Sequence, residues 1–396
     1  MAEWVECTIG DLCDTISDTY KGNDENVILV NTSDVLEGKV LNHTQVPNKN
    51  LKGQFKKTFR KNDILFSEIR PANKRFAFID FEDTSNYIAS TKLMVLRHNA
   101  KVIPEYLYAI LKSNYILAEL QHLAETRSGT FPQITFTSEL APMKVNLPDK
   151  KTQKQIVSIL SSIEQKMDSN ETINNNLEQQ AMALFKSWFI DYEPFDRQVP
   201  TTWKCGVLGD FVEIKRGGSP RPIQNFLSDS GLHWLKISDA TGISSPFINE
   251  IKEYIIEEGL KKTVFLKAGS LVLSNSATPG LPKILDIDTC IHDGWLYFPS
   301  SKFSNEYLYL YFKHIRDNLV ALGNGSVFTN LKTDILKNYP TNLPTDEVLN
   351  EFDEIIKPIF SMILSKTRES KRLTEIRDTL LPRLMSGELD VSDIDL

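Results

Sequence analysis

The sequence has few cysteines and no long apolar run. Its four cysteines, in 396 residues, form no Cys-x-x-Cys pair, which argues against a disulfide framework and against a structural zinc site. The longest apolar stretch, around 355–364, is interrupted by Lys357, Pro358 and Ser361. It is too short for a membrane span, and no charged-then-apolar leader follows Met1. We therefore expect a protein of the reducing cytoplasm.

Motifs for chemistry are also lacking. The chain has no phosphate-binding loop, no Asn/Asp-Pro-Pro-Tyr/Phe segment for an adenine and no glycine-rich turn for adenosylmethionine. Asp149, Glu164 and Lys166 imitate the acidic pair and lysine of metal-dependent nucleases, but the last two fall inside a predicted helix. His292-Asp293 has no nucleophile in a predictable place, which favours a structural hydrogen-bonded pair. We expect a protein that is not an enzyme and has no metal site.

Charge of one sign is segregated along the chain. The net charge of −7 counts against a surface that binds nucleic acid everywhere. However, the segment 48–75 carries nine lysines and arginines against two acids, whereas 388–395 is acidic. Such segregation suits a surface that faces phosphates. A solvated lysine-rich loop is the open alternative.

Half of the sequence repeats the plan of the other half. Residues 128–188 and 324–384 align at a fixed offset of 196 without a gap. Upstream, the segments 4–12 and 105–108 match 203–211 and 306–309. Such a repeat indicates pseudo-two-fold symmetry. The predicted order is globule, helix, globule, helix, with boundaries at 1–149, 150–195, 196–345 and 346–396.

The globules combine short strands with one helix each. Alternating apolar residues between turn formers predict strands at 27–30, 64–66, 76–79, 94–96, 234–237, 270–273 and 295–298. Apolar stripes predict helices over 105–123 and 305–322. The predicted fold class is α+β, with two mixed α/β domains joined by long helices.

The two long helices share one heptad frame. A 4-3 spacing runs from Thr152 to Asp191 and recurs 196 residues later, which predicts an antiparallel coiled coil formed by the two copies. Two ordinary core helices are the alternative, and Pro358 is expected to kink or restart the second helix. The middle of the seam is polar, with Asn170, Asn174, Lys366 and Ser370. The apolar seam comprises Ile156, Leu160, Ile163, Leu177, Leu184, Trp188, Phe352, Ile356, Ile359, Leu373, Leu380 and Leu384.

Four loops combine glycine, proline or small polar residues with basic or amide side chains, at 70–75, 127–130, 215–221 and 274–280. In such loops lysines favour phosphates, whereas arginine, asparagine and glutamine can reach base edges. Ordinary turns remain the alternative. The candidate DNA-binding residues are Lys56, Lys57, Arg70, Lys74, Arg75, Arg127, Gln133, Arg216, Arg221, Asn275 and Lys283.

Five segments, taken together with the repeat, form a pattern that is specific enough to indicate a family. They are EIKRGGSP at 213–220, LHWLKISD at 232–239, GSLVLSNSATPG at 269–280, and the helix endings LFKSWFIDYEPF at 184–195 and LLPRLMSGEL at 380–389. Over nearly its whole length the chain resembles the DNA-specificity subunits of type I restriction-modification enzymes. The resemblance does not carry over base contacts, because recognition loops differ between members of that family.

The resemblance implies two target-recognition domains, each reading one half of a bipartite site in double-stranded DNA, and an antiparallel helix pair that sets the spacer. It implies two modification subunits as partners, which carry S-adenosylmethionine and methylate adenine, and restriction subunits that use Mg and ATP. The chain itself is then expected to need no cofactor. The alternatives are a coiled-coil scaffold protein and a stand-alone DNA-modifying enzyme.

Overall fold

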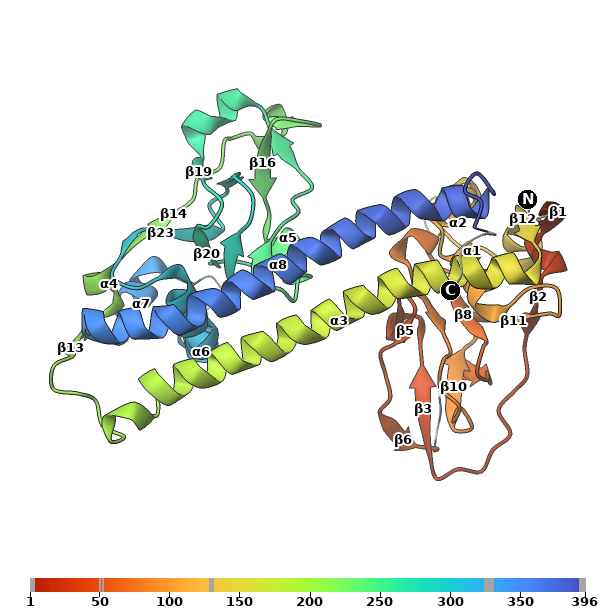
Figure 1. Ribbon diagram of the computed structural model, residues 1–396, viewed down its shortest axis with the longest axis horizontal. Helices are drawn as coiled ribbons and strands as arrows, with labels where there is room; N and C mark the ends of the chain where they lie inside the picture. The colour runs from red at the N-terminus through yellow and green to blue at the C-terminus, as the bar shows by residue number, and fades with distance from the viewer. Residues whose placement is uncertain (1–3, 50, 52, 128–131, 324–330, 392–396) are drawn as a thin grey trace. The chain divides into compact units, whose positions relative to one another are not determined.

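The computed structural model describes residues 4–49, 51, 53–127, 132–323 and 331–391 (Figure 1). The chain forms two compact units. The first unit comprises Met1–Gln165 and Leu373–Leu396, and the second unit comprises Lys166–Arg372. Two helices of 40 residues, α3 (Lys150–Phe189) and α8 (Asp346–Met385), each contribute one segment to each unit. No helix of the described ranges combines the length and hydrophobicity of a membrane-spanning segment.

The first unit contains two four-stranded sheets and two short ribbons. One sheet has the order β2-β11-β8-β9 (Cys13–Ile16, Leu93–His98, Ile64–Ser67, Phe76–Phe78), and the other has the order β6-β3-β10-β7 (Gln45–Pro47, Asn26–Val30, Tyr87–Ser90, Phe55–Lys57). The ribbons are β1-β12 (Trp4–Thr8, Lys144–Pro148) and β4-β5 (Val35–Leu36, Lys39–Val40). Helices α1 (Pro104–Leu111) and α2 (Asn114–Arg127) pack on the first sheet through a shared apolar core.

The second unit contains two five-stranded sheets. One has the order β14-β23-β20-β21-β17 (Val212–Arg216, Trp295–Ser301, Leu271–Ser274, Pro282–Leu285, Phe247–Ile248), and the other β15-β18-β16-β22-β19 (Leu227–Ser228, Tyr254–Ile255, Leu232–Leu235, Thr289–Ile291, Val264–Leu266). A ribbon pairs β13 (Lys204–Val207) with β24 (Pro340–Leu343). The helices are α4 (Leu208–Phe211), α5 (Ile237–Thr241), α6 (Asn305–Gly323) and α7 (Thr333–Lys337).

Short helical segments complete the chain. They have 3-10 geometry at Ile9–Asp11, Thr32–Asp34, Pro71–Asn73, Glu193–Phe195, Ile223–Asn225 and Glu257–Lys262, and π geometry at Phe136–Leu140. Each strand predicted from the sequence overlaps a strand of the structure, and the mixed helix-and-sheet class with two globular regions is confirmed.

The repeated Gly-Asp motif has the same role in both units. The Asp11 carboxylate accepts the backbone N–H of Thr8 at 2.9 Å, and that of Asp210 accepts the N–H of Val207 at 3.0 Å. Both carboxylates therefore satisfy a backbone donor at the start of a helical turn. The glycine before each aspartate lies against Ala141 in the first unit and against Lys337 in the second, and these two positions are separated by the offset of 196. The aligned repeat also includes 128–131 and 324–330, which lie outside the described residues.

Two helix predictions need correction. The helix predicted over 105–123 is interrupted, because α1 ends at Leu111 and α2 begins at Asn114, where the Ser113 hydroxyl accepts the N–H of Ile116 at 3.3 Å. Serine competes with helix continuation by capping a new first turn. Pro358 does not restart the second long helix, since α8 continues through it.

Pro358 is tolerated because it is exposed on α8 while the opposite face is buried. Ile356 and Phe360, on either side of it, are at most 1% exposed. Lys357 also pairs with Asp353 at 2.9 Å across the turn that lacks the proline N–H. Burial of such side chains offsets a proline cost of about 3 kcal/mol.

Within the second unit, α3 and α8 run antiparallel. The Trp188 and Phe352 rings lie 5.7 Å apart near one end. Towards the other end, Asn170 Nδ2 donates to Ser370 Oγ and Asn174 Nδ2 donates to Thr367 Oγ1, both at 3.3 Å. The polar middle of the predicted seam thus forms hydrogen bonds between the helices, and a shift of register would leave these amides without partners.

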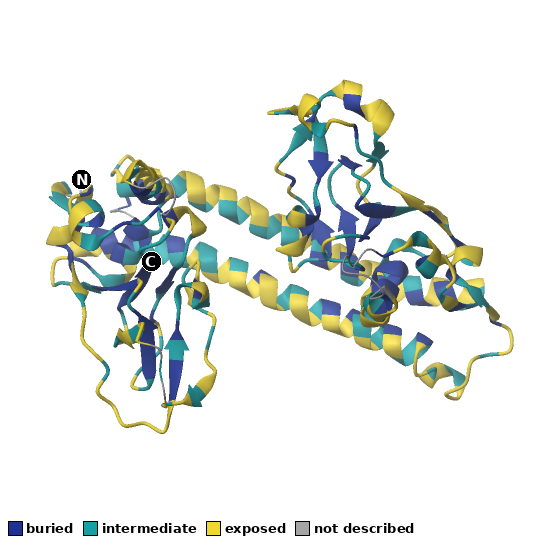
Figure 2. Ribbon diagram, turned by 180° about the vertical axis from the view of Figure 1, so that it is seen from behind, coloured by how far each residue is buried: buried dark blue, intermediate teal, exposed yellow. Residues whose placement is uncertain are grey.

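The seam residues differ in burial (Figure 2). Those that are buried are Ile156, Leu160, Phe352, Ile356 and Leu384, and those that are half-buried are Ile163, Leu177, Leu184, Trp188, Ile359, Leu373 and Leu380. In the first unit, Ile156 and Leu160 share a core with Leu381 and Leu384, so α3 and α8 also pack together there.

Candidate nucleic-acid interface

Three of the candidate DNA-binding residues converge on Asp293 in the second unit. Asp293 lies in the turn between β22 and β23, Arg216 ends β14, Arg221 follows in the next loop, and Asn275 follows β20. Antiparallel pairing of β23 with both β14 and β20 brings these segments together. Gly217 is required here, because a Cβ at that position would lie 2.2 Å from the carbonyl oxygen of His292.

Asp293 accepts hydrogen bonds through its carboxylate and its backbone carbonyl. The Ser219 hydroxyl donates to Oδ1 at 2.7 Å, and Arg221 Nη2 donates to Oδ2 at 3.2 Å. Arg216 Nε donates to the carbonyl oxygen, while its Nη2 lies 3.9 Å from Oδ2. Asn275 Nδ2 donates to the same carbonyl oxygen at 3.2 Å. One acidic residue thus anchors groups from three separate segments.

The electrostatics keep Asp293 ionised and His292 neutral at pH 7. Burial would raise the pKa of the Asp293 carboxyl, but the Ser219 hydroxyl and the two arginines lower it below its ordinary value. Burial lowers the pKa of His292, against the opposing charge of Asp293. His292 Nδ1 accepts the N–H of Gly294 at 2.8 Å, so its Nε2 carries the proton of the neutral ring and is a donor.

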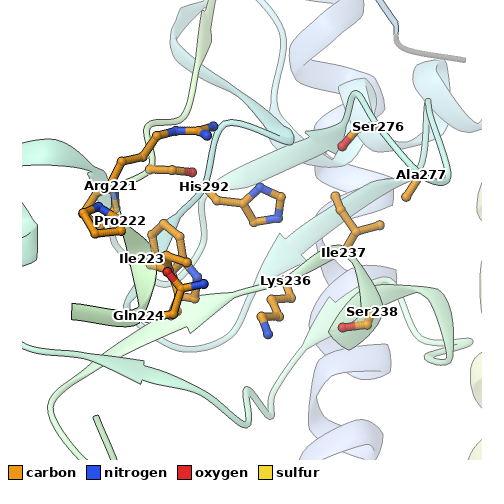
Figure 3. Close-up of a pocket in the computed structure, with 13 residues that line it drawn as sticks. Arg221, Pro222, Ile223, Gln224, Lys236, Ile237, Ser238, Ser276, Ala277 and His292 are labelled. Atoms are coloured by element: carbon orange, nitrogen blue, oxygen red, sulfur yellow. The ribbon is translucent and has the colours of Figure 1, made fainter. Parts of the chain in front are cut away.

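A cleft of about 940 Å³ lies beside this group (Figure 3). The His292 ring is central among the labelled side chains, with Arg221 and Gln224 on one side and Ser276 and Ala277 on the other. Lys236 pairs with Glu253. The cleft is lined by Ser219, Pro220, Arg221, Pro222, Ile223, Gln224, Trp234, Lys236, Ile237, Ser238, Ser276, Ala277 and His292. It therefore joins two of the predicted loops, 215–221 and 274–280.

In the first unit, the predicted loop at 70–75 lies beside α2 and the segment after it. The backbone N–H of Arg70 donates to the carbonyl of Pro132 at 3.2 Å, and Ala72 N donates to Gln121 Oε1 at 3.1 Å. Ile69 and Gln133 form a bridge, and Lys92 donates to Gln133 Oε1 at 3.5 Å. Arg70 and Gln133 are thus on neighbouring segments.

The remaining basic candidates of the first unit differ in their partners. Lys56 and Arg70 are exposed, and within the described ranges neither side chain has a hydrogen bond or ion pair. Lys74 pairs with Glu37 at 3.2 Å, and Arg127 pairs with Glu139 at 2.9 Å. Lys56, Arg70 and Arg127 are exposed, and Lys74 is half-buried.

Two other candidates bind the protein itself. Lys57 Nζ donates to the carbonyl of Leu93 at 2.8 Å, and burial lowers its pKa. Arg75 Nη1 donates to the carbonyls of Ser33 at 3.0 Å and Val35 at 3.3 Å. Both side chains are half-buried. Lys57 therefore stabilises the backbone of β11, and Arg75 stabilises the backbone of the 33–35 segment.

Lys283 and Asn275 are corrections to the sequence-based assignment, because both side chains point inward. Asn275 is 3% exposed and Lys283 is 2% exposed. Lys283 Nζ donates to the carbonyls of Ile243 at 2.6 Å and Ser245 at 2.5 Å, so it is not available to DNA. Burial lowers its pKa to about 8, opposed by Glu178. The Asn275 side chain instead holds the Asp293 backbone through the hydrogen bond to its carbonyl oxygen.

Lys283 should make stability depend on pH. Its pKa is about 8 in the fold and 10.5 as the ordinary value, so between these pH values the unfolded chain binds a proton that the folded chain does not. Stability then rises with pH across this window, by up to about 3 kcal/mol. The measurement is the free energy of unfolding of wild type minus that of Lys283→Met, by denaturant titration from pH 7 to 10.5.

Lys267→Met is the matched control for this experiment, because the Lys267 side chain is 74% exposed in the same unit. The difference in free energy of unfolding between wild type and Lys267→Met should stay constant over the same pH range. A constant difference for Lys283→Met would show that the ammonium is not penalised by burial.

Sequence reasoning missed the role of Asp293 and the place of Lys236 in the cleft. The pattern His292-Asp293-Gly294 after a buried strand was the available signal, but it indicated only a structural pair. The nuclease-like acids are far apart, since Asp149 caps the start of α3 through Lys151 N at 2.8 Å and Thr152 N at 3.0 Å. Glu164 lies about 22 Å further along the helix axis and pairs with Lys112.

Comparison with known proteins identifies the family. Residues 1–179 and 200–376 match the model of the type I restriction modification DNA specificity domain. The HindI specificity subunit of Haemophilus influenzae is 32% identical, with 98% of this chain and 100% of that protein covered. The MjaIX specificity subunit of Methanocaldococcus jannaschii is 25% identical, with 74% and 71% covered.

A solved structure shares the fold. The crystal structure of the type I restriction-modification S subunit from M. genitalium superposes with a TM-score of 0.56 at 14% identity, covering 99% of this chain and 97% of that one. The family match takes in both repeats of the sequence. The chain therefore belongs to the type I restriction-modification DNA specificity family and is a non-catalytic DNA-recognition subunit.

Proposed function

We propose that each globular domain reads one half of a bipartite sequence in double-stranded DNA, and that α3 and α8 fix the number of base pairs between the halves. Two modification subunits would bind this chain, supply S-adenosylmethionine and methylate adenine. Restriction subunits would add Mg and ATP-dependent cleavage. The complex would act in the cytoplasm, where its DNA substrate lies. The chain's own residues would bind and orient DNA.

The convergence of Arg216 and Arg221 on Asp293 carries this proposal. Both guanidinium groups are more than half exposed, at 55% and 77% of the side chain, and lie on a loop beside a cleft. Arginine presents a planar fork of donors that matches a guanine edge or a phosphate. In the first unit, exposed Lys56 and Arg70 offer positive charge without a competing ion pair in the described ranges.

The continuous helices support the spacer role. Each has 40 residues, which corresponds to about 60 Å at 1.5 Å per residue. The amide hydrogen bonds of Asn170 and Asn174 fix their register in the second unit. A pair with one register gives one length, as a defined spacer requires.

The test is a genome-wide map of adenine methylation in cells that carry this chain with its modification subunit. We expect methylation at one bipartite motif, which disappears when this chain is deleted. An assembled complex without any motif would favour a scaffold protein instead. Methylation or cleavage by the purified chain alone would favour a stand-alone enzyme.

A further inference from the structure

Among the described residues, the Arg221 side chain has one protein partner. Its Nη2 donates to Asp293 Oδ2 at 3.2 Å, and the side chain is otherwise 77% exposed. A guanidinium has five donors in a rigid plane, so this one carboxylate contact positions a single nitrogen beside Asp293 and leaves the other donors free to bind a ligand. The same carboxylate lies 3.9 Å from Arg216 Nη2.

Asp293 is itself rigidly placed. Its Oδ1 accepts the Ser219 hydroxyl at 2.7 Å, and its backbone N–H donates to the same Ser219 Oγ at 3.3 Å. Its carbonyl accepts from Asn275, which is 3% exposed. Because two segments distant in sequence hold this residue, its carboxylate has little freedom to turn away from Arg221.

This arrangement fits a base contact better than a phosphate contact. A carboxylate beside a phosphate would repel it, and a flexible lysine or arginine contacts a phosphate without such support. Guanine, in contrast, offers the O6 and N7 acceptors on one edge, and bidentate recognition requires a guanidinium of fixed orientation.

We infer that Asp293 is a positioning residue that determines specificity: it orients Arg221 to read a guanine in the half-site bound by the second unit. This inference rests on the proposed function. Arg216, the last residue of β14, is anchored to the Asp293 backbone carbonyl and is not the base-reading residue in this inference. His292 and the cleft are not needed for this contact.

The test uses the assembled modification complex and a plasmid library in which each base pair of both half-sites is varied. Asp293→Asn keeps the shape of the side chain but removes its charge and one acceptor. We expect the preference for guanine at one position of one half-site to fall by about 10-fold to 100-fold. All other positions, and the other half-site, should keep their preferences.

Arg221→Ala should relax the same position, and the double variant should be no worse than Arg221→Ala alone, because both changes remove one interaction. Asp288→Asn is the matched control, since it removes a carboxylate paired with Lys267 at 2.7 Å in the same unit. It should relax no position.

The outcomes are distinct. Absence of any motif with the wild-type chain would overturn the proposed function, whereas a wild-type motif left unchanged or uniformly weakened by Asp293→Asn would overturn only the role of Asp293. If Asp293→Asn abolishes methylation everywhere, Ser219→Ala tests the inference instead, because it removes one hydrogen bond that holds the Asp293 carboxylate but keeps its charge. Relaxation of one guanine position by that variant supports the inference, and uniform loss or no change refutes it.

Discussion

Insertion of one helical turn into both long helices is expected to change the spacer of the recognised DNA while both half-sites remain the same. Four added residues lengthen a helix by about 6 Å and rotate it by about 40° beyond a full turn. The added length corresponds to nearly two base pairs, since each base pair adds about 3.4 Å to the DNA axis. The added rotation corresponds to one base pair, since each base pair turns the DNA by about 35°. The expected spacer is one or two base pairs longer.

The structure indicates where the insertions belong. In the second unit, Arg368 pairs with Asp286, Lys371 Nζ donates to the carbonyl of Asn249 at 2.9 Å, and Ser370 bonds Asn170. Insertion after Gln165 in α3 and after Arg372 in α8, at the boundaries of the compact units, preserves all of these contacts. It also keeps the Lys112–Glu164 pair within the first unit.

The measurement is the methylation motif of the assembled complex with each variant. The same insertion in α3 alone is the control, because it misaligns the antiparallel partners and should abolish or strongly weaken methylation. A motif with the original spacer in the double-insertion variant would show that the helices do not set the spacing.

The long helices could be predicted from the sequence because their signal is local. Apolar residues at 4-3 spacing over about forty positions leave few alternatives, and the repeat of this spacing 196 residues later indicated a second helix of the same kind. Helix α3, at 150–189, begins where the predicted helical segment 150–195 begins and ends six residues before its end. The break at Ser113 was missed, because a serine cap and a helix-interior serine have the same local sequence.

The arrangement at Asp293 could not be predicted, because it depends on pairing between distant strands. Arg216 lies opposite Leu296 across β14 and β23, 80 positions further along the chain. Period-two patterns indicate strands but not their partners. Lys283 was misassigned for a related reason: charge suggests exposure, but the carbonyls of Ile243 and Ser245 provide acceptors in the interior.

The heptad frame accounts for only part of the buried face of α3 in the second unit. Leu184 and Trp188, predicted at the seam, are half-buried. Phe185 and Phe189 lie outside the 4-3 frame, yet they are at most 5% exposed, as is Ala181 within it. A heptad pattern assumes one partner helix, but this segment contacts both α8 and α6. Phe185 lies 6.3 Å from Phe352 of α8 and 5.2 Å from Tyr307 of α6, measured between ring centres.

Phe185→Ala is therefore expected to destabilise the second unit by about 3–5 kcal/mol, because it removes a fully buried ring and leaves a cavity among rings that cannot all collapse into it. Phe352→Ala, 1% exposed in the wild type, should have a similar effect. The measurement is the free energy of unfolding by denaturant titration, followed by tryptophan fluorescence. Leu322→Ala, in α6 and 61% exposed, is the control and should change stability by less than about 0.5 kcal/mol.

The double variant Phe185→Ala/Phe352→Ala tests whether these rings form one core. Because they contact each other, the second truncation enlarges an existing cavity, and its cost should be smaller than the cost of the same change alone. Strict additivity would mean that the two rings act independently. A loss below about 1 kcal/mol for Phe185→Ala would contradict its burial between α6 and α8. It would also contradict the inference that this face, together with the predicted seam, holds α3 in the second unit.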